Sequence, residues 1–186
     1  MPPERMLAAA DALFAAADQP MSVSMDAIAQ AAGVGKGTLF RAFGSRDALL
    51  DTLWAQRLGV LRTSVEGSHP ELGPHAVPQV RAQAFMGALL EFKLAHRHLI
   101  RAREAAPQLL RSTHYLWMHE VLQTQLSLAA GLSESVAAYR AHALLASIHI
   151  DLLEELMAQG FSPQDLRQHL REHVVSMLSP APSPMP

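Results

Sequence analysis

Three cations and four glycines share one short stretch, residues 31–50, which reads AAGVGKGTLFRAFGSRDALL. Between Ala27 and Arg46 the charged side chains are Lys36, Arg41 and Arg46, and all three are positive. Cations beside a helix start attract phosphate, and glycine lets a phosphate backbone approach the main chain closely. The chemistry that this stretch offers is therefore the binding of an anion, with nucleotides and nucleic acids as the first ligands to consider.

The spacing of the glycines excludes the two common nucleotide-binding loops. A P-loop requires G-x-x-x-x-G-K-[ST], but Gly35-Lys36 is followed by Gly37, and Gln30 stands where the first glycine belongs. A dinucleotide loop requires G-x-G-x-x-G after a strand. Here the third glycine comes one residue early, and the preceding residues 25–32 have helical periodicity.

The same glycines suit a helix-turn-helix unit, with short helices over 25–32 and 36–43 joined by a tight turn. Gly33 would end the first helix with a positive φ angle, Val34 would plug the turn into the core, and Gly44 would end the second helix. The inward face is predicted to hold Ile28, Ala29, Ala32, Leu39 and Phe43. The outward face of the second helix would carry Lys36, Gly37, Thr38, Phe40 and Arg41, of which the cations can reach guanine edges or phosphates.

Composition places this unit in an all-α protein. Alanine and leucine are abundant among the 186 residues, 49% are hydrophobic, and no segment alternates with a period of two. There is no cysteine and no apolar run near the roughly 20 residues that span a bilayer, so we expect a soluble, cytoplasmic protein with no membrane partner. A net charge of −2 confines any DNA contact to a local patch.

About nine helices are expected, punctuated by glycine at their ends and serine at their starts. Their predicted ranges are 4–17, 25–32, 36–43, 46–66, 78–96, 98–105, 107–130, 134–159 and 163–178. In the last of them Ser162, Pro163 and Asp165 form the pattern of a capped helix start. The domain boundaries follow: a helix-turn-helix domain over 1–45, a larger helical domain over 46–178, and a disordered, proline-rich tail over 179–186.

The first third of the chain resembles the N-terminal domain of TetR-type (tetracycline-repressor family) transcriptional regulators. The matching residues are Leu13-Phe14-Ala15, Ser24, Ile28-Ala29, Ala32-Gly33-Val34, Gly37-Thr38-Leu39, Phe43, Ser45-Arg46 and Leu49-Leu50. The resemblance implies a one-component regulator, most often a repressor, that binds a near-palindromic operator as a homodimer and is released by a small molecule. It adds Ser24 to the predicted DNA-binding residues and also Arg46, in the place where relatives use lysine to hold a phosphate.

Several positions depart from the family pattern. Gly35 stands where a serine usually caps the recognition helix, Phe40 replaces a tyrosine, Ala42 replaces a histidine, and the N-terminal arm offers only Arg5. The loss of these phosphate contacts predicts weaker and less salt-sensitive binding to DNA. It also leaves open an alternative, in which the chain is a TetR-like ligand- or partner-binding module with weakened or lost DNA binding.

In the larger domain, the segment 134–159 is apolar on more than one face, which predicts one partner in its own core and another in a second subunit. The predicted dimer interface consists of Ala137, Ala141, Leu144, Ile148, Leu166, Leu170 and Val174. A mainly apolar effector pocket is predicted from two helix faces and one further histidine: Phe85, Leu89, Phe92, His96, His114, Trp117, Met118, Val121 and His149. The alternative for each of these residues is ordinary core packing.

Metal and enzyme chemistry find little support. His169-x3-His173 places two imidazoles on one helix face, but no third ligand of a recognisable motif accompanies them. Glu66-Gly-Ser-His69 is the one Glu-x-x-His match, and it falls in a predicted loop instead of a bundle core. Neither G-x-S-x-G nor H-E-x-x-H occurs. We therefore expect no metal, no cofactor and no enzymatic activity.

Overall fold

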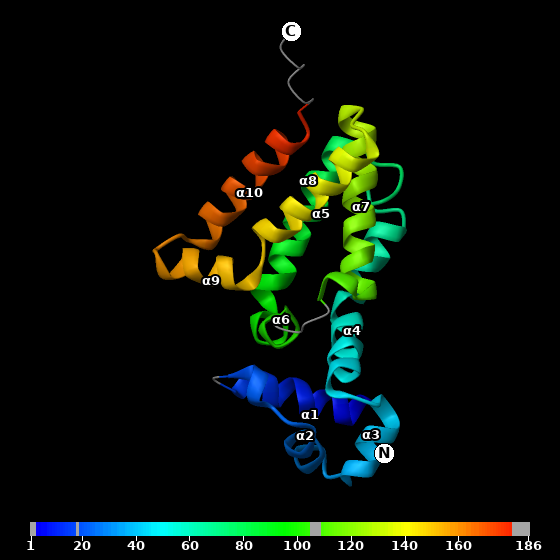
Figure 1. Cartoon of the computed structure of the whole chain (residues 1–186), viewed down its shortest axis with the longest axis vertical. Helices are drawn as coiled ribbons and strands as arrows, with labels where there is room; N and C mark the ends of the chain where they lie inside the picture. The colour runs from blue at the N-terminus through cyan, green and yellow to red at the C-terminus, as the bar shows by residue number, and fades with distance from the viewer. Residues whose placement is uncertain (1–2, 18, 105–108, 180–186) are drawn as a thin grey trace. The chain divides into compact units, whose positions relative to one another are not determined.

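The computed structural model describes residues 3–17, 19–104 and 109–179, and these residues confirm the all-α fold class (Figure 1). In this part of the chain there are ten α-helices and two short 3-10 turns. They are α1 (Pro3–Ala16), η1 (Pro20–Ser22), α2 (Met25–Ala32), α3 (Lys36–Phe43), α4 (Arg46–Glu66), α5 (Pro78–Ala95), α6 (Arg97–Glu104), η2 (Leu109–Arg111), α7 (Thr113–Ala130), α8 (Glu134–Ser147), α9 (Ile150–Ala158) and α10 (Pro163–Met177).

The chain packs as two compact units. The first comprises Met1–Gly59 and Ala95–Leu109, and the second comprises Val60–Leu94 and Leu110–Pro186. Packing therefore groups α6 and most of α4 with the first three helices, whereas the predicted boundary at residue 45 divides the chain by function and stays a prediction. The predicted tail, 179–186, lies outside the described residues except for Ser179.

The core of the first unit holds together the helix-turn-helix region. Phe14 of α1, Ile28 of α2, Leu39 of α3 and Leu49 of α4 are each 0% exposed and belong to one cluster. Leu99 of α6 is buried in the same cluster. Because α6 shares this core with α1, α3 packs on a scaffold that includes residues some 60 positions farther along the chain.

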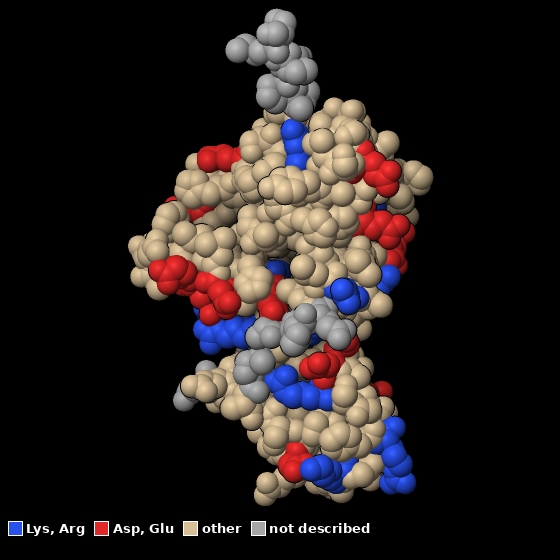
Figure 2. All heavy atoms as spheres, in the orientation of Figure 1, with Lys and Arg blue, Asp and Glu red and all other residues tan. Residues whose placement is uncertain are grey.

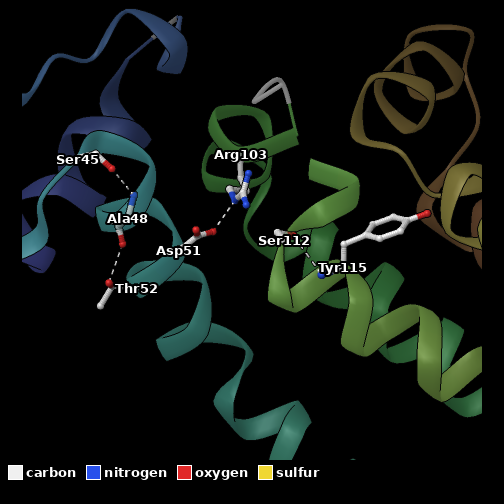
Figure 3. A network of polar contacts seen from close by, with 7 residues as sticks. All are labelled: Ser45, Ala48, Asp51, Thr52, Arg103, Ser112 and Tyr115. Atoms are coloured by element: carbon white, nitrogen blue, oxygen red, sulfur yellow. Dashed lines mark hydrogen bonds and ion pairs between the residues drawn. The ribbon is translucent and has the colours of Figure 1, made fainter. Parts of the chain in front are cut away.

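Ion pairs reinforce the same unit. Arg103 of α6 donates from Nε to Oδ1 of Asp51 of α4 at 2.7 Å, and Figure 3 shows the two side chains pointing toward each other. Asp11 of α1 pairs with Arg57 of α4 and, at 3.1 Å, with Nε2 of His98 of α6. Burial alone would raise the pKa of Asp11, but the hydrogen bonds from His98 and Arg57 outweigh it and lower that pKa.

The second unit is a helical bundle in which α7 packs along α8. Ser112 caps α7, since its hydroxyl oxygen accepts a hydrogen bond from the Tyr115 amide at 3.2 Å (Figure 3). At the start of α10, Ser162 and Asp165 form the complete capping box around Pro163, as the sequence predicts.

The single helix predicted over 134–159 is wrong, because the structure breaks it into α8 and α9. The chain leaves helical geometry at Ile148 and His149, and Figure 1 shows α9 turning sharply away from α8. Lys93 of α5, which is 4% exposed, donates from Nζ to the Ile148 carbonyl at 2.7 Å. The buried ammonium thus stabilises a carbonyl that the break releases, which local sequence periodicity does not reveal. The helix predicted over 107–130 also starts later, at Thr113.

Candidate nucleic-acid interface

The turn between α2 and α3 has the geometry that the glycines predict. Ser24 caps α2 through a 3.2 Å hydrogen bond from the Ala27 amide, and Gly33 ends that helix with φ +66° and ψ +34°. Gly44 ends α3 with φ +77°. These positive φ angles lie in the left-handed region, which residues with a side chain disfavour. The backbone conformation therefore explains why glycine stands at both positions.

The two faces of α3 also separate as predicted. Ile28, Ala29, Ala32 and Leu39 are buried, and Val34 and Phe43 pack partly buried against the same core. Lys36, Gly37 and Arg41 are exposed on the outer face, Thr38 is half-buried, and the Phe40 ring is 39% exposed. The outer face of this eight-residue helix thus combines two exposed cations with an exposed aromatic ring.

Neither the backbone conformation nor the neighbouring atoms of the protein require a glycine at position 37. Gly37 lies in the first turn of α3 without a positive φ angle, and a Cβ atom placed on it would meet nothing within 4 Å. A glycine in such a position costs helix stability. Its lack of a side chain leaves room for something that approaches from outside, such as a nucleic acid backbone.

The two cations of α3 are available for such a partner. Lys36 pairs with Asp26 at 2.7 Å, but the two side chains are 60% and 62% exposed, so this pair contributes about 0–1 kcal/mol and exchanges readily. Among the described residues Arg41 makes no hydrogen bond or ion pair. Figure 2 shows basic side chains gathered at the end of the first unit where α2 and α3 lie, with an acidic group beside them.

Arg46 makes contacts inside the protein that the resemblance does not imply. Its Nε donates to the Val23 carbonyl and its Nη2 to the Pro20 carbonyl, each at 2.9 Å, while its guanidinium lies 5.4 Å from the centre of the Phe14 ring. Burial lowers the pKa of Arg46. The side chain therefore ties the start of α4 to the segment before α2. It helps to hold the helix-turn-helix unit together, and the contact with a phosphate that the resemblance implies stays a prediction.

The starts of α2 and α3 differ in their caps. The Ser24 hydroxyl is exposed and accepts its capping bond through oxygen, so its hydrogen remains able to reach a phosphate; its DNA contact stays a prediction. At Gly35 the start of α3 has no side-chain cap, which agrees with the departure noted from the sequence.

In the second unit, most residues of the predicted effector pocket lie in the core, and their contact with an effector stays a prediction. Phe85, Leu89, Phe92, His114 and Met118 are buried in the core, and Val121 is half-buried. The Trp117 ring stands edge-on to Phe85 with centroids 5.6 Å apart, and the guanidinium of Arg62 lies 5.1 Å from its centre. The aromatic and methionine side chains at helical spacing therefore pack against neighbouring side chains in the core.

Two histidines of the predicted pocket, His96 and His149, lie apart from its other residues. His96 belongs to the first unit, where burial and the nearby charges of Arg57 and His98 lower its pKa. His149 caps α9 at the helix break. Neither residue lines either of the two cavities described next.

Two cavities open instead along α10. The larger, about 540 Å³, is lined by the α4–α5 loop, α5 and α10, and its rim carries the ion pair between Arg167 and Glu91. The smaller, about 290 Å³, lies among α5, the α8–α9 break, α9 and α10. Leu90 and Leu170 line both, so the cavities adjoin across these two side chains.

The predicted dimer residues face the core of their own chain. All seven are at most 7% exposed in the single chain: Ala137, Ala141, Leu144, Ile148, Leu166, Leu170 and Val174. In the single chain the residues of α8 among them pack against α7 and the rest of the same bundle, and their contact with a second subunit stays a prediction.

Sequence reasoning missed the opposite face of α8. Tyr139 is 75% exposed, and Val136 and His142 are also exposed. The residues Val136, Tyr139, His142 and Ala146 recur at spacings of three and four, so they form one outward stripe, which we name the α8 face. The sequence does indicate this stripe through its low charge, because Glu134 and Arg140 are the only acidic and basic residues of α8 apart from its histidine.

His142 of this stripe also belongs to an aromatic cluster between α7 and α8. The Tyr115 hydroxyl lies 2.7 Å from its Nδ1, and the His119 ring lies 4.0 Å from its ring centre to centre. Burial and the charge of His119 lower the pKa of His142. Within the described ranges, no three His, Asp or Glu side chains gather as a metal site. None of the helices described has both the length and the apolar character needed to cross a bilayer.

Comparison with known proteins agrees with this geometry. Residues 6–53 match the model of a family described as bacterial regulatory proteins, tetR family, which confirms the resemblance seen in the sequence. A TetR-like transcriptional regulator from Rhodococcus sp. RHA1 has a TM-score of 0.65, 20% identity and 94% coverage of each chain. A second transcriptional regulator from Rhodococcus sp. Rha1 reaches a TM-score of 0.68 at 21% identity, covering 96% of each chain.

The TetR family repressor AlkX from Dietzia sp. strain DQ12-45-1b, implicated in biodegradation of n-alkanes, is 25% identical with a TM-score of 0.51. The match covers 94% of this chain and 96% of AlkX. The comparison with curated proteins gave no match. The chain thus has a TetR-like fold, and this fold supports a DNA-binding regulator.

Proposed function

We propose that this chain, whose N-terminal residues belong to the tetR family of bacterial regulatory proteins, is a repressor that binds a near-palindromic operator as a homodimer and is released by a small molecule. The observation that carries the proposal is the outer face of α3. There Arg41, Lys36 and the unobstructed Gly37 stand exposed at the second helix of a helix-turn-helix unit.

We assign sequence readout chiefly to Arg41. Its guanidinium makes no bond within the described part of the chain, so binding a guanine edge breaks no existing contact. Lys36 exchanges its exposed partner Asp26 for a phosphate at little cost. With Arg46 engaged in the protein and the serine cap absent, few phosphate contacts remain, so binding should depend weakly on salt.

The test is fluorescence anisotropy on DNA from upstream of the protein's own gene, with a genome-fragment selection to supply the operator if that DNA binds only nonspecifically. Arg41→Ala should weaken operator binding by about 1–3 kcal/mol while nonspecific DNA binding changes little. Arg111→Ala, which removes the same charge from an exposed position of η2 in the second unit outside both cavities, is the matched control and should bind as wild type. Equal behaviour of the two variants, or failure to select any DNA, would instead favour the module that has lost DNA binding.

We assign the dimer contact to the α8 face (Val136, Tyr139, His142 and Ala146). The only cation of α8, Arg140, is held away from that stripe by hydrogen bonds from Nη1 to the carbonyls of Met177 and Ser179, each 2.6 Å. Figure 2 shows a broad surface without charged side chains over the part of the second unit where α8 lies. Depletion of charge with an exposed aromatic side chain is typical of an interface core, and a two-fold dimer would present two α3 helices to two half-sites.

The small-molecule effector is assigned to the cavities along α10. Their volumes, about 540 and about 290 Å³, compare with the range of about 300–1,000 Å³ of small-molecule sites. The chain passes between the two units within α4, within α5 and between Leu109 and Leu110, so a change in the second unit has three covalent routes to the first. An effector needs to favour the non-binding state by about 1–3 kcal/mol to release the operator.

A further inference from the structure

The smaller cavity of the second unit has an unusual lining. Six aliphatic side chains form its walls, from α5, the α8–α9 break, α9 and α10, together with Ser147 and two histidines. The aliphatic members are Leu90, Ile148, Leu153, Leu156, Leu166 and Leu170. No Asp, Glu, Lys or Arg belongs to the lining, so His169 and His173 are its ionisable groups.

The α8–α9 break creates this cavity. Because α9 turns away at Ile148, Leu153 and Leu156 form a wall that a straight continuation of α8 would not place there. The Lys93 ammonium, bonded at 2.7 Å to the Ile148 carbonyl, holds the break in place from α5. Ser147 is also engaged, since its hydroxyl donates to the Leu144 carbonyl at 2.7 Å. The apolar walls are thus built on a fixed bend of the backbone.

The two imidazoles stand together at one side of these walls. His169 and His173 are four residues apart on α10, and so they lie on the same helix face, flanking the buried Leu170. Edge contact with the Phe161 ring, 6.0 Å between centroids, positions the His169 ring. Its Nδ1 lies 3.4 Å from a carboxylate oxygen of Glu172, a long contact between side chains that are 60% and 61% exposed. Each imidazole carries at least one N–H donor in either protonation state.

We propose that this cavity takes the effector, and that the effector has an aliphatic body and an acidic head that accepts hydrogen bonds from His169 and His173. The inference rests on the proposed function and names the ligand class of its sensor. A carboxylate suits the site because the lining offers two donors and no competing acid, and a hydrogen bond to a charged acceptor is stronger than one to a neutral group. A cation would meet no carboxylate in this lining.

The larger cavity is less suited to the same ligand. Its rim contains Glu71 and Glu91, and Glu91 already holds both Nε and Nη2 of Arg167. A carboxylate ligand that binds Arg167 would have to break this ion pair, and the free energy lost with the pair would offset part of the free energy gained from the new contact. In the smaller cavity the corresponding contact, between Nδ1 of His169 and Glu172, is longer at 3.4 Å and involves one of the two imidazoles. Leu90 of the smaller cavity lies on α5, and the chain continues from α5 directly into α6, which packs on α1 in the first unit.

Isothermal titration with octanoate, octanol and octylamine on the full-length protein tests the proposal. Octanoate should bind, octanol should bind about tenfold or more weakly for want of the charged hydrogen bonds, and octylamine should not bind measurably. The double variant His169→Leu/His173→Leu should lose the preference for octanoate while still binding octanol. Leu153→Trp should fill the cavity and abolish both.

The matched control is Gln164→Leu, which adds an apolar side chain to an exposed position of α10 outside both cavities and should behave as wild type. Circular dichroism confirms that each variant is folded, and the histidine variant keeps the test decisive if Leu153→Trp misfolds. Octanoate binding that survives the histidine substitutions, equal binding of octanoate and octylamine, or no octanoate binding at all would overturn the proposal.

Anisotropy on DNA separates this inference from the proposed function. A protein that binds its operator but not octanoate refutes the ligand assignment and leaves the repressor intact. A protein that binds octanoate as described yet selects no DNA supports the cavity and refutes the repressor. Release of the operator by octanoate from wild type but not from the histidine variant would support both.

Discussion

The structure gives Arg46 a role that a single substitution can separate from the role implied by its family position. Arg46→Ala removes two hydrogen bonds from a charged group to the carbonyls of Val23 and Pro20, each 2.9 Å, and the contact with the Phe14 ring. Because the site is half-buried, we take about 1 kcal/mol for each bond and about 0.5–1 kcal/mol for the ring contact. The free energy of unfolding of the first unit should fall by about 2–3 kcal/mol.

Urea unfolding measures this loss in the unit concerned. Trp54 is 2% exposed in the first unit and Trp117 lies in the second, so in a Trp117→Phe background the fluorescence reports on the unit that contains Arg46. Operator binding is then measured at three salt concentrations under conditions where the variant is folded. We expect the slope of log K against log salt to be unchanged. A phosphate contact would instead lower that slope by about 0.9 and leave the stability alone, and this result would refute our reasoning.

Three further outcomes follow from the structure. Gly37→Ala should raise the stability of the first unit by a few tenths to about 1 kcal/mol, because alanine suits a helix better and its Cβ meets no atom. The same variant should weaken operator binding in anisotropy; unchanged affinity would remove Gly37 from the interface. Tyr139→Asp should convert the dimer to a folded monomer in light scattering, whereas Val60→Asp, at an 80% exposed position of α4, should not. A Tyr139→Asp variant that stays dimeric would exclude the α8 face. Acidification should destabilise the first unit: the pKa of His96 is lowered in the folded chain, so its contribution is complete above pH 6.5 and is lost as the pH falls below that value. Asp11, whose pKa is also lowered, adds a loss of the same sign below pH 3.8. His96→Gln should reduce the change of the urea midpoint between pH 7.5 and 5.5. An equal change of the midpoint in variant and wild type would contradict the assignment to His96.

The helix-turn-helix was predictable because its determinants are local. The left-handed turn at Gly33, the stop at Gly44 and the cap at Ser24 each depend on a few consecutive residues, and the structure has all three as predicted. The same holds for the capping box of α10 around Pro163. A backbone conformation that few residue types tolerate leaves its mark directly in the sequence.

The roles of the remaining side chains were decided by tertiary structure. Arg46 finds its carbonyl partners 23 and 26 residues earlier in the chain, and Lys93 supports a helix break 55 residues away. Ala137 and Leu144 are apolar in a helical pattern, and the helices packed against them bury both in the single chain. Periodicity tells which face of a helix is buried, but only the assembled fold determines what buries it.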